Sequence, residues 1–176
     1  ASARPFVTHH NALDIPLYLR ISDELFLKKL IVGGFEAVYE FSRDFRNEGM
    51  DREHLQEFDH MEFYWAYGNL SQGMKFSEEL FRLIVRNVLG GYVHTFEGVN
   101  IDWERPFERV DYFEAFQKET GVDLSGQVTV EDLMKKADEL EISYEKSYGK
   151  GRMIDLLYKR TVRQKLIQPC FLTGHP

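Results

Sequence analysis

Residues 35–67 read FEAVYEFSRDFRNEGMDREHLQEFDHMEFYWAY, and this stretch decides the fold. Its two ends, residues 35–47 and 57–67, are rich in aromatic residues that alternate with polar ones, which is typical of half-buried β-strands. The polar segment between them, residues 48–56, contains Gly49, the only glycine of the stretch. Two strands joined by such a loop are expected to pair antiparallel.

The period of two gives each strand two different faces. On the second strand, Met61, Phe63, Trp65 and Tyr67 share a face that we expect to pack on a core. The opposite face of that strand is mixed and carries Phe58, His60, Glu62, Tyr64 and Ala66. On the first strand, the polar face carries Glu40, Ser42, Asp44, Arg46 and Glu48. If the polar faces coincide, one side of the sheet presents Arg46, Glu48, Phe58, Glu62 and Tyr64.

Patterning alone leaves two interpretations of this polar side open. An arginine can bind a phosphate or a carboxylate through its planar fork, an aromatic ring can stack on a base, and a carboxylate can hold an ammonium group. The same pattern is also typical of an ordinary solvated sheet face with scattered charge pairs. Charge placement by itself therefore does not identify a site.

Outside this stretch, capping residues mark where helices begin and end. Ser22-Asp23-Glu24 predicts the start of a helix of about ten residues, which Gly33-Gly34 ends. Capping boxes at Asp111-x-x-Glu114 and Thr129-x-x-Asp132 predict two more helix starts. The other expected elements are a strand at residues 5–8, a helix at 77–89, a hairpin of 92–96 and 99–103, a helix at 152–166 and a strand-like segment after Pro169. Strands and helices do not alternate regularly, so the predicted class is α+β, an antiparallel β-sheet flanked by helices.

The composition fits one folded domain over residues 1–176. Of these residues 43% are hydrophobic and 14% aromatic, which is enough to fill a core. Lys and Arg number 22 against 29 Asp and Glu, so the net charge of −7 disfavours coating of nucleic acid by charge alone. The single cysteine, Cys170, excludes a disulfide framework and a cysteine metal cage within one chain, and favours a reducing, cytoplasmic location.

Several features point away from a membrane, a metal and a complete chain. No apolar run approaches the roughly 18 residues of a membrane helix, and no signal peptide follows Ala1, so we expect no membrane contact. His9-His10 does not predict a metal site, because adjacent strand residues point to opposite faces. The chain does not begin with Met and ends soon after a strand-like segment, so we expect a fragment.

The wording of the opening stretch resembles a known motif. Phe45-Arg46-Asn47-Glu48-Gly49, Glu57-Phe58 and Glu62-Phe63-Tyr64 resemble motif 2 of class II aminoacyl-tRNA synthetases. Segments 4–14, 17–21 and 30–36 resemble the lysine enzymes in particular, and the likeness continues more loosely from Gly149 to Pro169. The resemblance implies a single, incomplete catalytic domain over residues 1–176, with the motif 2 hairpin at about 35–67 and a helical and hairpin insertion at about 75–165.

The resemblance assigns four residues to ATP. It implies that Arg46 is the catalytic residue and holds the ATP α-phosphate together with the lysine carboxylate, neutralising charge that builds on phosphorus. Phe58 stacks on the adenine, Glu48 contacts the amino edge of the base, and His54 reaches the outer phosphates. Leu55 stands where an asparagine is usual and cannot supply a polar contact to ATP.

The lysine site implied by the resemblance adds three side chains to Arg46. Glu24 and Glu62 bind the amino groups of lysine, and Tyr64 lines the side-chain pocket. Two carboxylates suit this substrate, because a desolvated ammonium needs acceptors. His60 stands where methionine is usual, a departure that, like Leu55, bears on the geometry expected for ATP.

The implied reaction is formation of lysyl-adenylate from L-lysine and ATP, followed by transfer to the 3′ end of tRNA(Lys). In the full enzyme the resemblance implies a homodimer, an OB-type anticodon-binding domain, motif 1, motif 3 and Mg²⁺, whose ligands we expect beyond this chain. We expect weak activity or none from these 176 residues alone. Two alternatives remain: a paralogue that delivers lysine to a protein, and a non-catalytic remnant that binds lysine or nucleotide.

Overall fold

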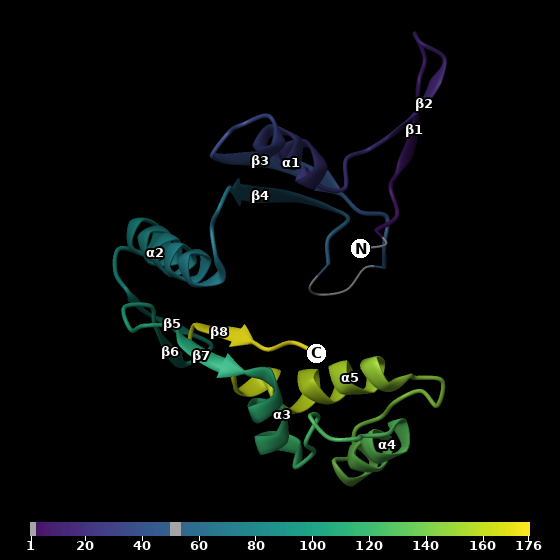
Figure 1. Cartoon of the computed structure of the whole chain (residues 1–176), viewed down its shortest axis with the longest axis vertical. Coiled ribbons are helices and arrows are strands. Elements are labelled where there is room, and N and C mark those ends of the chain that lie inside the picture. Colours follow the sequence, from purple (N-terminus) through teal and green to yellow (C-terminus); the bar gives the residue numbers. More distant parts are fainter. Residues whose placement is uncertain (1–2, 50–53) are drawn as a thin grey trace. The chain divides into compact units, whose positions relative to one another are not determined.

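The computed structural model describes residues 3–49 and 54–176, and its contacts divide the chain into two compact units, residues 1–69 and 70–176 (Figure 1). The division falls between the predicted end of the motif 2 hairpin, at about 67, and the predicted start of the insertion, at about 75. The assignment of residues 1–176 to a single, incomplete domain stays a prediction.

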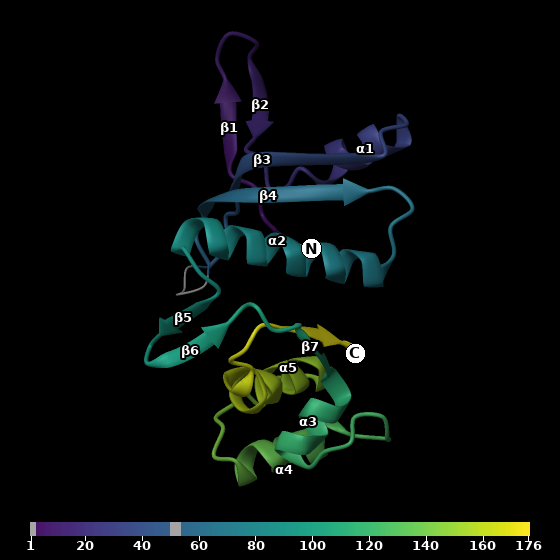
Figure 2. The same cartoon turned by 90° about the vertical axis from the view of Figure 1, so that its left-hand side faces the viewer.

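The first unit contains two antiparallel strand pairs and one helix. Strands β1 (Val7–His10) and β2 (Ile15–Tyr18) form a hairpin, helix α1 (Glu24–Val32) follows, and β3 (Ala37–Phe45) pairs with β4 (Glu57–Trp65). Figure 2 shows β3 and β4 as the longest strands, running in opposite directions. The predicted antiparallel pair and the helix that Gly33 ends are confirmed, whereas β2 was not predicted.

The register of β3 and β4 brings their polar faces together, as expected. Glu40 lies opposite Glu62, Ser42 opposite His60, and Asp44 opposite Phe58. Helix α1 packs against both strands and buries Leu27, which is 2% exposed. Asp44, on the polar face, has no exposed surface.

One prediction about the opposite, aromatic face of the sheet is wrong. We expected the face with Met61, Phe63, Trp65 and Tyr67 to pack on a core, but in the structure Trp65 is 48% exposed and Tyr67 fully so. On β3, Tyr39 and Phe41 on the same face are 71% and 76% exposed. The reason is that α1 lies on the polar face, and no described residue covers the aromatic one to a comparable degree.

The second unit begins with a long helix and contains a core formed by three later helices. Its elements are α2 (Leu70–Leu89), β5 (Val93–Phe96), β6 (Val99–Asp102), β7 (Glu108–Asp111), α3 (Tyr112–Thr120), α4 (Val130–Glu139), α5 (Lys150–Thr161), the 3₁₀ turn η1 (Arg163–Lys165) and β8 (Cys170–Thr173). The core lies among α3, α4 and α5. Its side chains with no exposed surface are Phe116, Leu133, Ala137, Met153 and Leu157.

Both helix starts predicted from capping boxes in this unit are confirmed, but only the second has a complete capping box. The Asp111 carboxylate accepts a hydrogen bond from the Glu114 backbone N–H at 3.0 Å and begins α3. Thr129 and Asp132 form a reciprocal capping box at α4. The hairpin of β5 and β6 turns at Glu97 and Gly98, both with positive φ, which is the geometry of a tight primed turn.

Three predictions for this unit need correction. Helix α2 begins at Leu70, seven residues before the predicted start at 77, and the last helix ends at Thr161 before a 3₁₀ turn. Strand β7 was not predicted. It pairs in parallel with β8, Glu108 opposite Cys170, so the strand expected to lack a neighbour has one.

Candidate active site

The four residues predicted to bind ATP line one cavity. It has a volume of about 340 Å³ and is lined by Arg46, Glu48, Gly49, His54, Leu55 and Phe58. These residues come from the end of β3, the start of β4 and the loop that joins them, of which residues 50–53 lie outside the described part. The antiparallel pair therefore places a guanidinium, a carboxylate, an imidazole and a phenyl ring around one space.

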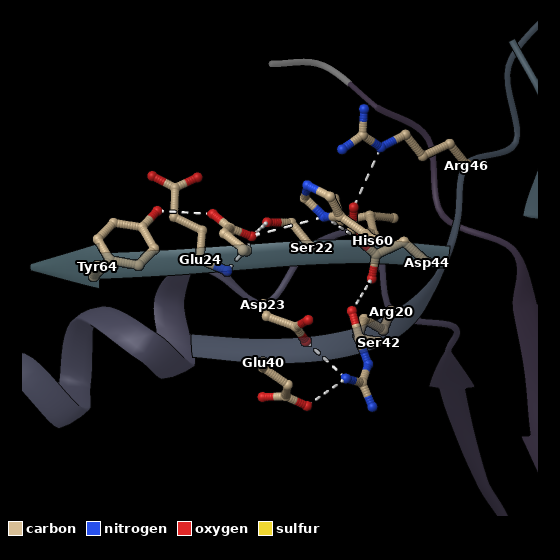
Figure 3. Close-up of polar contacts among 12 residues, drawn as sticks. Arg20, Ser22, Asp23, Glu24, Glu40, Ser42, Asp44, Arg46, His60 and Tyr64 are labelled. Atoms are coloured by element: carbon tan, nitrogen blue, oxygen red, sulfur yellow. Dashed lines mark hydrogen bonds and ion pairs between the residues drawn. The ribbon is translucent and has the colours of Figure 1, made fainter. Parts of the chain in front are cut away.

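Arg46 is held at the edge of this cavity by its surroundings. Its backbone N–H donates to the Gln56 carbonyl at 2.9 Å, which closes the strand pair beyond Phe45. Its side-chain Nε donates to the Ile21 carbonyl at 3.3 Å (Figure 3). The guanidinium carbon lies 5.2 Å from the centroid of the Phe58 ring, a cation–π distance. Arginine and ring are thus oriented together without any ligand.

Phe58 is also supported on the sheet by its neighbour on the same face. Its ring packs edge-on against the His60 imidazole, with centroids 6.2 Å apart. The ring is partly exposed at the cavity. A rigid aromatic ring that is half open in this way can stack on a planar base.

The residues predicted to bind lysine form a second group on the same face. Glu62 accepts hydrogen bonds from the Tyr64 hydroxyl at 2.9 Å and from the Ser22 hydroxyl at 3.3 Å. Burial and the adjacent Glu62 carboxylate raise the pKa of Tyr64 to about 12, and the charge of Glu24 adds to the rise. The phenol therefore stays protonated and donates to Glu62 at neutral pH.

Glu24 lies at the first position of α1 and is half exposed. Its carboxylate is paired with the Lys28 ammonium one turn along the helix, and the hydrogen bond from Lys28 lowers the pKa of Glu24. Lys28 also lies over the Tyr64 ring, 5.7 Å from its centroid. The Glu24 carboxylate is thus already paired with an ammonium group of its own helix.

Beneath these groups lies a buried polar layer that the sequence did not assign to the site. His60 Nδ1 lies 2.9 Å from Asp44 Oδ2, and the Ser42 hydroxyl donates to Asp44 Oδ1 at 3.2 Å. Beside them, the Asp23 carboxylate is 1% exposed and accepts from Arg20 at 2.7 Å. The signal for this layer was the alternation of polar residues on the first strand, which marked Ser42 and Asp44 but not the burial of Asp44.

Asp23 carries an unsatisfied atom in this layer. Its Oδ2 is buried and has no hydrogen-bond partner among the described residues. Burial alone would raise the pKa of Asp23, but the nearby Ser42 hydroxyl and the Arg20 guanidinium outweigh it, so the pKa lies below its ordinary value. Asp23 is therefore an anion at neutral pH, and Arg20, which also contacts Glu40 at 3.0 Å, is its counterion.

The polar face thus has two chemically different ends. Figure 3 shows Tyr64 and Glu24 at one end, Arg46 at the other, and His60 with Asp44 between them. Carboxylates gather at the first end, where they can accept hydrogen bonds from an amino group. The guanidinium at the second end can bind an anionic carboxylate or phosphate. The arrangement suits a small ligand with an ammonium and a carboxylate group.

Across residues 3–49 and 54–176, no three His, Cys, Asp or Glu side chains are grouped so as to hold a metal ion. Within the same ranges, no helix combines the length and the hydropathy that crossing a membrane requires.

Comparison with known proteins relates the chain to a family. The family model for tRNA synthetases class II (D, K and N) matches residues 1–176. The lysine–tRNA ligase of Porphyromonas gingivalis strain W83 is 49% identical over all 176 residues, which make up 30% of that protein. The lysine–tRNA ligases of Christiangramia forsetii and Lactiplantibacillus plantarum are 47% and 44% identical, again over the whole chain, which covers 31% and 35% of their lengths. The chain thus spans about a third of the length of these curated relatives. With an α+β fold and a match over its whole length, the chain belongs to the class II tRNA synthetase family of the D, K and N type.

Proposed function

We propose that this chain is the motif 2 part of a lysine–tRNA ligase, which activates L-lysine with ATP and transfers it to the 3′ end of tRNA(Lys). The proposal is supported by the names of its relatives and by the two ends of the polar face. The observation that carries it is that Arg46, Glu48, His54 and Phe58 line one cavity. The lone Cys170, a free thiol, fits work in the reducing cytoplasm.

In the first step, a carboxylate oxygen of lysine attacks the α-phosphorus of ATP. A new P–O bond forms, the bond to the bridging oxygen breaks, and pyrophosphate leaves with the electron pair. Negative charge builds on the α-phosphate, and the Arg46 guanidinium neutralises it while it also holds the lysine carboxylate. Phe58 stacks on the adenine, Glu48 accepts from its amino group, and His54 contacts the outer phosphates.

The amino groups of lysine are held at the other end of the face. Glu62 and Glu24 accept their hydrogen bonds, and the protonated Tyr64 keeps the Glu62 carboxylate in place at 2.9 Å. In this proposal the substrate ammonium takes the place beside Glu24 that the Lys28 ammonium now occupies. Catalysis then consists of positioning and charge neutralisation, and no nucleophilic side chain is required.

In the second step, a ribose hydroxyl at the 3′ end of the tRNA attacks the carbonyl carbon of lysyl-adenylate. An ester bond forms and the hydroxyl proton is released. The bond between the carbonyl carbon and the phosphate oxygen breaks, and AMP leaves with the electron pair. We propose that Mg²⁺, with its ligands in parts of the whole enzyme beyond these residues, would neutralise charge on the ATP phosphates when bound. We propose that the whole protein is a homodimer, as the resemblance implies.

The test uses a chimera in which residues 1–176 replace the matching segment of the Porphyromonas gingivalis ligase, to which they are 49% identical. ATP–pyrophosphate exchange is measured with lysine, and with arginine and ornithine as controls for specificity. We expect lysine-dependent exchange in the chimera and little or none in the 176-residue chain alone.

Three results would change the proposal. Exchange with an amino acid other than lysine would contradict the assigned substrate. Exchange with lysine but no transfer to tRNA(Lys) would favour a paralogue that modifies a protein. No exchange, with lysine or ATP still bound in calorimetry, would favour a non-catalytic remnant.

A further inference from the structure

The residue between the two ends of the polar face, His60, has no role in the proposed function so far. We propose that His60 is a positioning residue for the lysine site: its imidazole, anchored on the buried Asp44, fixes the Glu62 carboxylate that receives the substrate amino group. The proposal rests on the proposed function, because it assumes that Glu62 binds lysine.

The geometry places the imidazole between two carboxylates. His60 Nδ1 lies 2.9 Å from Asp44 Oδ2 on the neighbouring strand and 3.9 Å from Glu62 Oε2 on its own strand. His60 and Glu62 are two residues apart on β4, so their side chains project from the same face. The closer carboxylate anchors the ring, and the farther one is held beside it.

Burial explains why Asp44 needs this partner. Asp44 has no exposed surface, and a buried carboxylate is costly unless it is paired and hydrogen-bonded. The Ser42 hydroxyl supplies one neutral hydrogen bond at 3.2 Å. The Arg20 guanidinium contacts Asp23 and Glu40. The His60 N–H is therefore the donor that satisfies the second oxygen of Asp44.

Three neighbouring side chains restrict the Glu62 carboxylate. Tyr64 donates to its Oε1 at 2.9 Å and Ser22 to its Oε2 at 3.3 Å, while the imidazole lies 3.9 Å from Oε2. The Glu62 side chain keeps only 18% of its surface exposed. A carboxylate restricted in this way presents its remaining lone pairs in one direction, which lowers the entropy cost of binding an ammonium.

The charged groups that face the imidazole come from three elements. They are Asp44 from β3, Glu62 from β4 and Asp23 at the start of α1, whose pKa the charge of His60 helps to lower. The Phe58 ring packs on the other side of the imidazole, with centroids 6.2 Å apart. A change at His60 thus acts on the lysine end through Glu62, and on the ATP end only through ring packing.

The test measures binding of lysine and of ATP, separately, by calorimetry to the Porphyromonas gingivalis ligase chimera that carries residues 1–176, with the unmutated chimera as the wild type. His60→Met removes the donor but keeps a side chain of similar length. We expect the Kd for lysine to rise about 10-fold or more, because a buried carboxylate loses a charge-assisted hydrogen bond, and the Kd for ATP to change less than about 3-fold. His60→Gln, whose amide can donate to Asp44, should restore most of the lysine affinity. His94→Gln, at a histidine that contacts the Gly91 carbonyl in the second unit, is the matched control and should change neither Kd.

The outcomes separate the positioning role from the function. If the wild type binds lysine and H60M binds it with the same Kd, the positioning role is overturned and the proposed function still stands. A rise of both Kd values by the same factor would indicate a purely structural role and overturn it as well. No lysine binding by the wild type would overturn the function and the positioning role together.

A second variant keeps the proposal testable if H60M does not fold. Asp44→Asn keeps the shape of the side chain but removes the charge that anchors the imidazole. We expect the Kd for lysine to rise at least about 3-fold, because a charge-assisted hydrogen bond is replaced by a neutral one. An unchanged Kd would overturn the proposal.

Discussion

Arg46 and Arg43 offer a matched test of the polar face, because they lie close together in the sequence and differ in the face they occupy. Arg46 lines the cavity, with its guanidinium over Phe58. Arg43 projects from the opposite face of β3, where it pairs with Glu57 at 3.0 Å and Asp59 at 3.1 Å. The perturbation is alanine at each position, made in the ligase chimera.

The expected losses of exchange activity differ by a factor of about 50 or more. Loss of a donor that stabilises transition-state charge costs about 10²- to 10³-fold in rate, so Arg46→Ala should reduce lysine-dependent exchange by that factor or more. Arg46→Lys should recover only part of it, because lysine has the charge but not the planar fork. Arg43→Ala removes exposed ion pairs, which contribute about 0–1 kcal/mol to stability, and we expect exchange to stay within about 2-fold of the wild type.

The assay is ATP–pyrophosphate exchange at saturating and limiting lysine, with thermal unfolding as the check on folding. If R46A exchanged within 10-fold of the wild type, the assignment of Arg46 to the reacting phosphate would be wrong. Equal losses in R46A and R43A would refute the argument from the two faces, since only one of these arginines reaches the cavity.

Three further predictions test the pocket and the second unit. In Glu62→Gln, the pKa of Tyr64 should fall from about 12 towards its ordinary value of 10.0, seen as ultraviolet absorbance of tyrosinate. Because folding raises this pKa, the stability that Tyr64 contributes to the wild type is complete below pH 10 and is lost between pH 10 and about 12. If the Tyr64 pKa were unchanged in the variant, the role of Glu62 would be contradicted. Leu133→Ala should lower the free energy of unfolding of the second unit by about 2–5 kcal/mol in denaturant titration, because Leu133 has no exposed surface. Thr129→Ala should lower this free energy of unfolding by only about 1 kcal/mol, because the substitution removes the hydroxyl that accepts from the Asp132 backbone N–H. A loss as large as that in L133A would mean that capping is not the main role of Thr129.

The parts of the fold that were predicted from the sequence are those with local signals. The turn at Gly98, the capping box at Thr129 and the antiparallel pair of β3 and β4 each depend on neighbouring residues or on a period of two. Strand β7 has no such signal, because its partner β8 lies about 60 residues later in the chain. The start of α2 was missed because Gly73 lies inside its first turns, where glycine lowers helix propensity by about 1 kcal/mol relative to alanine.

The candidate site shows the same division between local pattern and packing. Residue alternation placed Glu62 and Tyr64 on one face, and the register of the strands confirms that Asp44 shares it. Which face is buried could not be read from the alternation. The aromatic face had the stronger hydrophobic signal, yet Phe41 on that face is 76% exposed while Asp44 on the polar face is fully buried. Burial depends on which segments pack on each face, and the alternation of residues in one strand does not report that.

The division into two compact units also gives the chain two natural optical reporters. Of its two tryptophans, Trp65 lies on β4 in the first unit and Trp103 follows β6 in the second, where it stacks on Phe81 with ring centroids 6.1 Å apart. A Trp65→Phe variant leaves tryptophan fluorescence only from the second unit, and Trp103→Phe leaves it only from the first. Denaturation followed by emission in these two variants therefore reports separately on each unit, without an attached dye, and non-coincident transitions would reveal that the units melt as independent cooperative blocks.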